Sequence, residues 1–208
     1  EVSKIASIQT LKQNLIQKWN DRLNGCQSSI DVWQKILSVR SILLSKYENL
    51  DSWVKLSNMC LKQGQASVSE RTLAIVKQEV SKVIPNEKDM PPQLVLASLD
   101  CNFATGTLGT EDYMNKIGNY LDSIDSSDEL KSKYYIKLGR ILKKEREETS
   151  EESIQEILSY YEKACKHNKD NYKAWHHLGL MNFEAVEYYS NLNEKSYKKA
   201  IHTHVIAS

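Results

Sequence analysis

The sequence predicts an all-α protein, an α-solenoid of antiparallel helix hairpins, and three observations support this prediction. The 208 residues include only three prolines and seven glycines, so few residues interrupt helices. Apolar residues recur at spacings of three and four along most of the chain, as on the buried face of an amphipathic helix. A leucine followed by a small residue recurs about every 40 residues, which indicates stacked repeats.

The first half of the chain contains four predicted helices, separated by residues that stop or start a helix. Residues 3–24 carry one apolar stripe that ends before Gly25, and Ser29 offers the N-cap of a second helix reaching Tyr47. Because the second helix is apolar over more than one face, we expect neighbours on two of its sides. Pro85 closes the fourth helix. The predicted ranges are 3–24, 29–47, 49–64 and 66–84.

Five further helices are predicted in the second half. Thr110, Ser126 and Ser150 are suitable start signals, and the charged run KKEREE at 143–148 is predicted to be a solvated helix end or loop. The predicted ranges are 91–104, 110–121, 126–148, 150–165 and 171–189. Residues 193–208 have too little apolar surface for an assignment. We expect a frayed helix or the edge of a loop there, which gives nine or ten helices in all.

An internal repeat of hairpin length runs through the chain. The pairs Leu56-Ser57, Leu96-Ala97, Leu138-Gly139 and Leu178-Gly179 are separated by 40, 42 and 40 residues. Three copies have an aromatic ring three residues before the leucine, whereas the copy at Leu96 has Gln93. Repeats of this length are typical of tetratricopeptide- and HEAT-like solenoids, in which neighbours bury each other's apolar faces. The predicted anchors of equivalent core positions are Trp53, Leu56, Tyr135, Leu138, Gly139, Trp175, Leu178 and Gly179.

Composition excludes several classes of protein. A formal net charge of +1 argues against bulk nucleic-acid binding, and no apolar run is long enough to predict a membrane span. The four cysteines contain no CxxC pair, so we expect buried free thiols of a reduced compartment. The first residue is Glu1 and no signal-peptide pattern follows, so we expect the chain to be a piece of a longer protein.

No catalytic or metal-binding motif is present in the sequence. It lacks a Walker loop, a kinase glycine-rich loop, HRD and DFG runs and a GxSxG elbow, so we predict no catalytic residue in this fragment. For the neighbours His176 and His177 we expect one ring inside and one in solvent. His202 and His204 form an HxH pair without a third ligand nearby, so no metal site is predicted.

Several cations occupy positions that matter once the repeats stack. Lys133 and Lys137 are four residues apart and share a helix face, Lys173 begins the last predicted helix, and Arg40 lies within an apolar helix. A buried cation requires a compensating anion. Ordinary pairing with Asp or Glu is one explanation, and convergence of several cations on a polyanionic small molecule is the other.

Two segments carry a resemblance to a known family. The runs VWQKILSVRS in Trp19–Gly64 and YKAWHHLGLMNFEAV in Ile157–Tyr189 are similar to the FAT domain of the target of rapamycin (TOR) kinases, which are phosphatidylinositol-3-kinase-related serine/threonine protein kinases. Residues 85–130 match only in order and helical character. The register suggests that 1–208 is one FAT fragment, with 193–208 ending beside a variable insertion.

The resemblance implies a regulatory scaffold. In that family the FAT repeats clamp the kinase domain and support assembly of TOR complexes in nutrient and growth signalling. The implied partners are the kinase domain and remaining FAT repeats of the same chain, together with TOR complex subunits, and the implied location is the cytoplasm, at endomembrane surfaces through the parent complex. This fragment would have no kinase activity of its own. The repeat alone leaves another hypothesis open, a free-standing tetratricopeptide adaptor that binds peptide or protein partners.

The resemblance also implies a ligand, although no cofactor is required. The family has a basic FAT pocket that holds inositol hexakisphosphate as a structural ligand. Carried over by motif, Lys137 of IKLG and Lys173 of YKAW keep a lysine, and Lys133 stands where the family commonly has arginine. Arg40 of VRS and Arg71 of ERTL are further candidate contacts.

Overall fold

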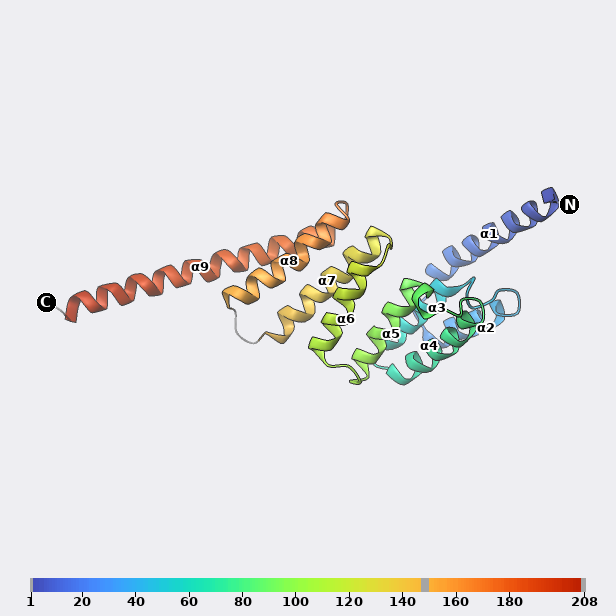
Figure 1. Ribbon diagram of the computed structural model, residues 1–208, viewed down its shortest axis with the longest axis horizontal. Helices are drawn as coiled ribbons and strands as arrows, with labels where there is room; N and C mark the ends of the chain where they lie inside the picture. Colours follow the sequence, from blue (N-terminus) through green and yellow to red (C-terminus); the bar gives the residue numbers. More distant parts are fainter. Residues whose placement is uncertain (1, 147–149, 207–208) are drawn as a thin grey trace. The chain divides into compact units, whose positions relative to one another are not determined.

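A computed structural model describes residues 2–146 and 150–206, and within these ranges all regular structure is helical, as predicted (Figure 1). Each of the nine predicted helices corresponds to one observed α-helix, and a short 3-10 turn, η1, precedes the fifth. The bounds are α1 Val2–Asn24, α2 Ile30–Arg40, α3 Leu50–Lys62, α4 Ala66–Ser81, η1 Glu87–Asp89, α5 Pro92–Ala104, α6 Thr110–Ser123, α7 Asp128–Glu145, α8 Glu151–His167 and α9 Tyr172–Ile206.

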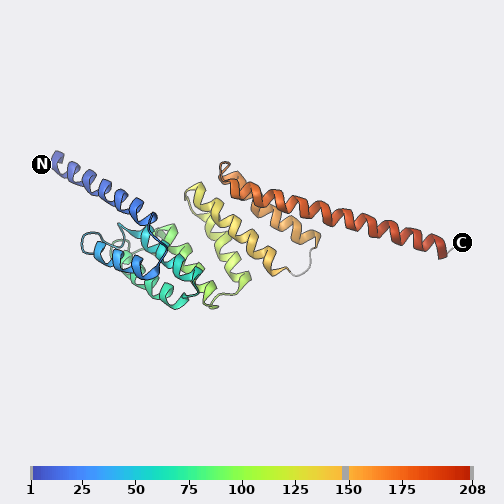
Figure 2. The same ribbon diagram turned by 180° about the vertical axis from the view of Figure 1, so that it is seen from behind.

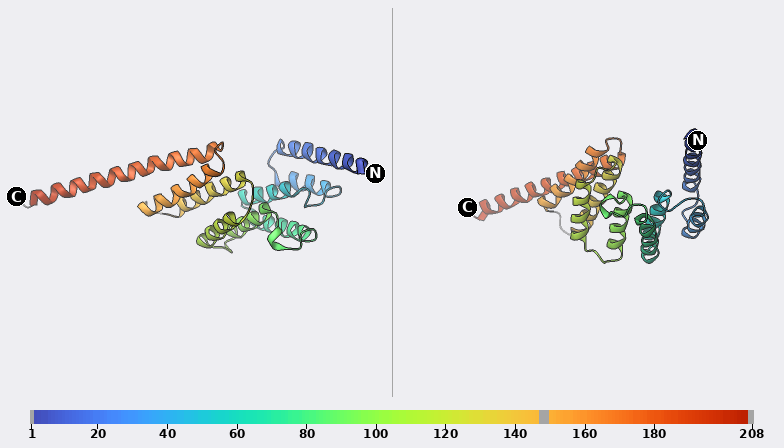
Figure 3. Two further views of the ribbon diagram at one scale, coloured as in Figure 1. Left: turned by 45° about the horizontal axis from the view of Figure 1, so that its top comes forward. Right: turned by 45° about the vertical axis from the view of Figure 1, so that its right-hand side comes forward.

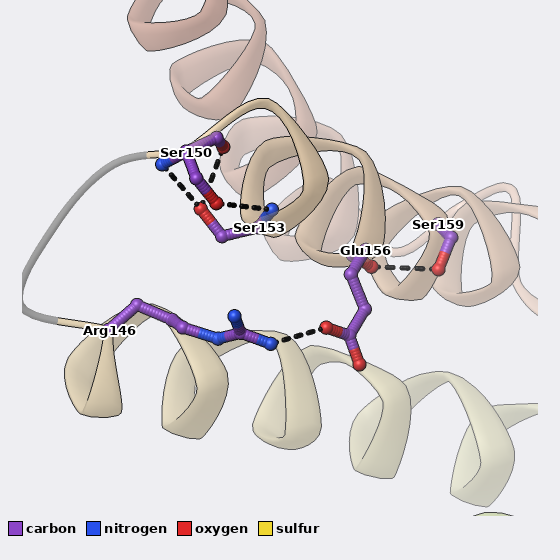
Figure 4. Close-up of polar contacts among 5 residues, drawn as sticks. All are labelled: Arg146, Ser150, Ser153, Glu156 and Ser159. Carbon is purple, nitrogen blue, oxygen red and sulfur yellow. Dashed lines mark hydrogen bonds and ion pairs between the residues drawn. The ribbon is translucent and has the colours of Figure 1, made fainter.

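The predicted start and stop signals act locally. Figure 4 shows Ser150 and Ser153 at the start of α8, where each backbone N–H donates to the other residue's hydroxyl in a capping box. Ser127 caps α7 by accepting a hydrogen bond from the N–H of Leu130. Gly64, which follows α3, adopts a φ of +73°, a conformation that glycine reaches without steric cost.

The second helix is shorter than predicted. It ends at Arg40 because the N–H groups of Leu43 and Leu44 both turn back to the Arg40 carbonyl. The reversal buries Leu44 and leaves Ile42 80% exposed. Within unit 1, defined below, the stretch has α1 and α3 as neighbours, as predicted, whereas Val39 and Leu43 stay exposed together with Ile42.

The last helix is longer than predicted, because α9 continues through Ile206 instead of ending near residue 189. Residues 147 and 148 of the charged run lie outside the described residues. The earlier part of that run is solvated as predicted, and Lys143 and Arg146 form ion pairs with Glu184 and Glu156.

The chain divides into two compact units, Glu1–Tyr113 (unit 1) and Met114–Ser208 (unit 2). In unit 1, α3, α4 and α5 lie side by side (Figures 1 and 2). Trp53 is partly buried and packs against two apolar clusters, one shared by α3, α4 and α5 and one shared by α1, α2 and α3. The first cluster contains Leu50, Val54, Leu73, Val76, Val80, Met90, Leu94, Ala97 and Cys101, and the second contains Leu23, Ile30, Trp33, Leu37, Leu56 and Cys60.

In unit 2, α7 and α8 form an antiparallel hairpin, and α9 packs against both helices (Figure 3). The side chains buried in this unit include Tyr135, Leu138, Leu142, Ile154, Ile157, Tyr161, Ala174, Met181 and Ala185. The C-terminal part of α9 extends beyond the end of α8 (Figure 2). Each unit therefore buries apolar faces between successive helices, as a solenoid does.

Three of the four cysteines are buried, as expected. Burial raises the pKa of the thiols of Cys60, Cys101 and Cys165. The prediction fails for Cys26, which is exposed because it follows the last turn of α1. All four thiols are free. In the described ranges, no helix combines the length and hydropathy needed to cross a membrane.

Candidate functional site

Three of the predicted ligand-binding cations belong to unit 2. Lys133 and Lys137 are the sixth and tenth residues of α7, and Lys173 is the second residue of α9. The amide of Asn171, directly before α9, donates a hydrogen bond of 3.0 Å to the hydroxyl of Ser132 on α7. The start of α9 therefore lies against the first turns of α7, in the neighbourhood of Lys133.

The three lysines differ in exposure and contacts. Lys133 and Lys173 are exposed, and among the described residues neither of them forms an ion pair with a carboxylate. The Lys173 ammonium lies 5.7 Å from the centre of the Tyr172 ring. Lys137 is half-buried, and its ammonium lies 5.7 Å from the centre of the Tyr134 ring. Ammonium groups can form charge-assisted hydrogen bonds with the oxygens of a polyanion.

The same end of unit 2 contains a polar cluster that joins α7 and α8. His167 Nδ1 lies 2.8 Å from a carboxylate oxygen of Asp128, and the imidazole stacks on Tyr135 with ring centres 5.5 Å apart. The Lys163 ammonium lies 5.6 Å from the centre of the Tyr135 ring. The carboxylate of Asp128 is thus already engaged by His167.

The two predicted arginines belong to unit 1. The guanidinium of Arg40 is buried against α1, where it donates to the carbonyl of Trp19 and to the side-chain oxygen of Asn20. Burial lowers the pKa of Arg40. Its partners are neutral oxygens instead of the expected carboxylate. Arg71 is exposed on α4.

Most of the predicted repeat anchors lie inside the protein. Leu56 and Leu138 are fully buried, and Tyr135 is 2% exposed. Gly139 lies directly under the ring of Tyr161 on α8, because a Cβ atom added at this position would be 2.6 Å from Tyr161 Cε1. The glycine therefore permits the close approach of α7 and α8.

The anchors in α9 have different surroundings. Trp175 was predicted to be a core residue, and this is wrong, because its ring is 50% exposed. Its indole N–H donates a 2.7 Å hydrogen bond to the carbonyl of Lys169, which holds the ring over the turn between α8 and α9. Leu178 is only partly buried, and no atom lies within 4 Å of a Cβ added at Gly179.

Sequence reasoning missed two tyrosine–aspartate hydrogen bonds between consecutive helices. The hydroxyl of Tyr113 on α6 donates to Asp100 on α5 at 2.6 Å, and the hydroxyl of Tyr135 on α7 donates to Asp122 on α6 at 2.8 Å. In each bond the tyrosine and the aspartate are 13 residues apart in the sequence. This recurring spacing is the signal from which the two bonds could have been predicted. The pKa of Tyr135 is raised. Burial of the phenol is the largest cause, and the hydrogen bond to Asp122 is the second.

The histidines that the structure describes are not part of a metal-binding cluster. In the described parts of the chain, no group of three or more His, Cys, Asp or Glu side chains could hold a metal ion. His177 stacks on Tyr161 and burial lowers its pKa, whereas His176 is exposed. The side chains of His202 and His204 lie outside the described residues.

Comparison with known proteins gives the family. A family model for the FAT domain matches residues 2–208. Serine/threonine-protein kinase tor1 of Schizosaccharomyces pombe is 29% identical to this chain in an alignment 201 residues long. The alignment covers 85% of this chain and 9% of that protein. TOR of Oryza sativa is 28% identical over 193 residues, covering 83% and 8%, and TOR2 of Saccharomyces cerevisiae is 26% identical over 231 residues, covering 94% and 9%. The chain spans only 8–9% of the length of these curated relatives. It belongs to the FAT domain family.

Proposed function

We propose that this chain is a non-catalytic regulatory segment of a TOR serine/threonine protein kinase, in which the FAT repeats clamp the kinase domain and support assembly of a TOR complex. The observation that supports this proposal most strongly is the FAT match across residues 2–208, together with relatives that are themselves named serine/threonine-protein kinases. Its partners are then the kinase domain and remaining repeats of the same polypeptide, and TOR complex subunits. The site of action is the cytoplasm, at endomembrane surfaces through the complex.

Lysine-directed crosslinking of the full-length protein tests the clamp. We expect crosslinks from exposed lysines of this segment, such as Lys62 and Lys144, to a kinase domain in the same polypeptide. Crosslinks between α7 and α9 within unit 2 are the positive control. If only those internal crosslinks formed, or if the full-length polypeptide had no kinase domain, the clamp would be rejected in favour of a free-standing adaptor.

We also propose that Lys133, Lys137 and Lys173 bind inositol hexakisphosphate as a structural ligand. Their placement on α7 and at the start of α9, two helices tied together by Asn171 and Ser132, supports this site. Phosphate oxygens form strong charge-assisted hydrogen bonds with ammonium groups, and the N-terminal end of a helix also favours an anion. Arg71 and Arg40 stay predicted ligand contacts from the sequence; both belong to unit 1, where Arg40 already donates to Trp19 and Asn20.

A ligand that binds only the folded chain stabilises it by about 2.7 kcal/mol at a concentration of 100 Kd. We therefore expect inositol hexakisphosphate to raise the melting temperature of the 208-residue chain, and the double variant Lys137→Glu/Lys173→Glu to abolish the rise. The control Lys62→Glu/Lys144→Glu makes the same change in net charge at exposed lysines that are not among the candidate ligand contacts. An equal rise in both double variants would show that the site is assigned wrongly.

A further inference from the structure

A pocket of about 250 Å³ lies between α4 and α5 of unit 1, beside the η1 turn; we call it the α4–α5 pocket. Its floor is apolar, because it includes Met90 and Leu94, which belong to the buried core of the unit. The partly buried side chains of Val95 and Leu99 line its sides. Pockets for drug-sized molecules usually measure about 300–1,000 Å³, so this one suits a smaller metabolite.

Two opposite charges stand at the edge of the α4–α5 pocket. The ammonium of Lys77 on α4 lies 3.1 Å from a carboxylate oxygen of Glu87 in η1, and both side chains are more than half exposed. Ser98 of α5 also lines the pocket, and its hydroxyl donates to the carbonyl of Leu94, so the hydroxyl oxygen can still accept a hydrogen bond. An exposed ion pair contributes little to stability, so its two groups can exchange partners at small cost.

The turn that carries Glu87 is held in place by its own hydrogen bonds. The side-chain oxygen of Asn86 accepts from the N–H of Lys88 at 3.3 Å, and its amide donates to the carboxylate of Asp89 at 2.8 Å. Met90, the next residue, is buried in the core. The backbone at Glu87 is therefore positioned before any ligand arrives, and preorganisation of this kind lowers the cost of binding.

The arrangement of charges and apolar surface selects one class of ligand. A lone carboxylate or a phosphate would gain Lys77 but would meet the like charge of Glu87, and an amine without a carboxylate would meet the like charge of Lys77. An α-amino acid carries an ammonium and a carboxylate on either side of one carbon atom. Each of its charges can therefore face the opposite charge of the ion pair while its side chain enters the pocket.

We propose that the α4–α5 pocket binds a free amino acid with an apolar side chain of the size of leucine or methionine. The ligand's ammonium pairs with Glu87, its carboxylate pairs with Lys77, and its side chain packs on Met90 and Leu94. Because these contacts exist only in the folded unit, the bound amino acid also stabilises unit 1. The site uses none of the cations assigned to the inositol phosphate, so it holds whether or not that ligand binds or the segment clamps a kinase.

Equilibrium dialysis of radiolabelled leucine against the full-length protein tests the proposal. The variants Lys77→Met and Glu87→Gln each remove one charge and keep most of the side-chain volume. The controls Lys82→Met and Glu79→Gln make the same changes in an exposed ion pair of α4 that does not line the pocket. We expect saturable binding of leucine that is weakened at least about fivefold in each pocket variant and is unchanged in the controls.

Blocked ligands separate the zwitterion from its parts. N-Acetylleucine lacks the ammonium and leucinamide lacks the carboxylate, so each should compete with labelled leucine at least about fivefold less well than unlabelled leucine does. Glycine should compete poorly as well, because it has no side chain to bury. Equal competition by either blocked ligand, equal weakening in the control variants, or no saturable binding of leucine and methionine up to about 10 mM would each overturn the proposal.

A pocket-filling variant tests the position of the ligand without changing a charge. Val95→Trp places a large ring at the side of the α4–α5 pocket and should abolish leucine binding. Thermal unfolding shows whether this variant is folded. Leucine binding that persists in a folded Val95→Trp variant would put the ligand elsewhere and overturn the site. If Val95→Trp does not fold, the variants at the exposed Lys77 and Glu87 decide alone.

Discussion

Helices α7 and α9 carry the same residue pattern 40 positions apart, but one is covered and the other is open. Tyr135 and Leu138 of α7 are buried, and Gly139 lies under the ring of Tyr161. On α9, Trp175 is half-exposed and Gly179 has no neighbour within 4 Å of an added Cβ. The pattern therefore specifies the face on which a following helix packs, and burial depends on whether that helix is present.

The largest expected difference concerns the two equivalent leucines. Leu138→Ala removes a fully buried side chain from α7, so it should lower the free energy of unfolding by about 2–5 kcal/mol. Leu178→Ala removes a partly exposed side chain from α9 and should cost less than about 2 kcal/mol. Urea unfolding of the two variants checks the order. Equal losses would mean that the two helices are equally covered.

The two glycines should respond with opposite signs. In Gly139→Ala the new Cβ would be 2.6 Å from the buried ring of Tyr161, and such overpacking costs about 1–3 kcal/mol. In Gly179→Ala the methyl group meets no atom within 4 Å, so the better helix propensity of alanine should add about 0.5–1 kcal/mol. Thermal unfolding measures both. A stabilised Gly139→Ala variant would contradict the close approach of α7 and α8.

Tyr135 should make stability depend on pH in the alkaline range. Because the pKa of Tyr135 is raised in the folded chain, its contribution is complete below the unfolded tyrosine pKa of about 10 and is lost as the pH rises toward the folded value. Tyr135→Phe should cost about 0.5–1.5 kcal/mol at pH 7, where the hydrogen bond to Asp122 is lost. Unfolding measured from pH 8 to 11 should decline less steeply in the variant. An identical decline in the two proteins would show that ionisation of Tyr135 does not contribute to the pH dependence of stability.

The smallest effect belongs to the ion pair between α7 and α9. Lys143 and Glu184 are both partly exposed, so their coupling free energy should be only about 0.2–1 kcal/mol. A double-mutant cycle with alanine at both positions measures it, and 1 M salt should reduce it further. A coupling well above 1 kcal/mol would show that this contact holds α9 in place more strongly than its exposure indicates.

Much of the fold was predictable, because apolar spacing and caps act locally. Helix α8 begins directly after its N-cap residue Ser150 and helix α3 ends before Gly64, at the positions that the sequence predicted. The end of α2 was not predictable, since Ile42 and Leu43 continue the apolar pattern while the turn is set by the burial of Leu44. The exposure of Trp175 was missed for a similar reason, because a local pattern does not say whether a neighbouring helix is there.

The candidate site was predictable only in part. Helical spacing puts Lys133 and Lys137 on one face of α7, and the structure adds the hydrogen bond from Asn171 to Ser132, which holds the start of α9 against α7. Spacing alone could not foresee that Arg40 turns to the carbonyl of Trp19 on α1. It also missed the bond from Tyr135 to Asp122, since side-chain pairing between helices depends on how they pack.

Hydroxyl-radical footprinting of Trp175 and Tyr135 tests the difference between α7 and α9 most directly. In the 208-residue chain, Trp175 and Phe183 should be oxidised readily, whereas the buried Tyr135 should be protected. In the full-length protein, Trp175 and Phe183 should become protected and Tyr135 should not change. Equal oxidation of Trp175 and Phe183 in the two proteins would contradict the claim that α9 presents an open copy of the packing face that α7 has filled.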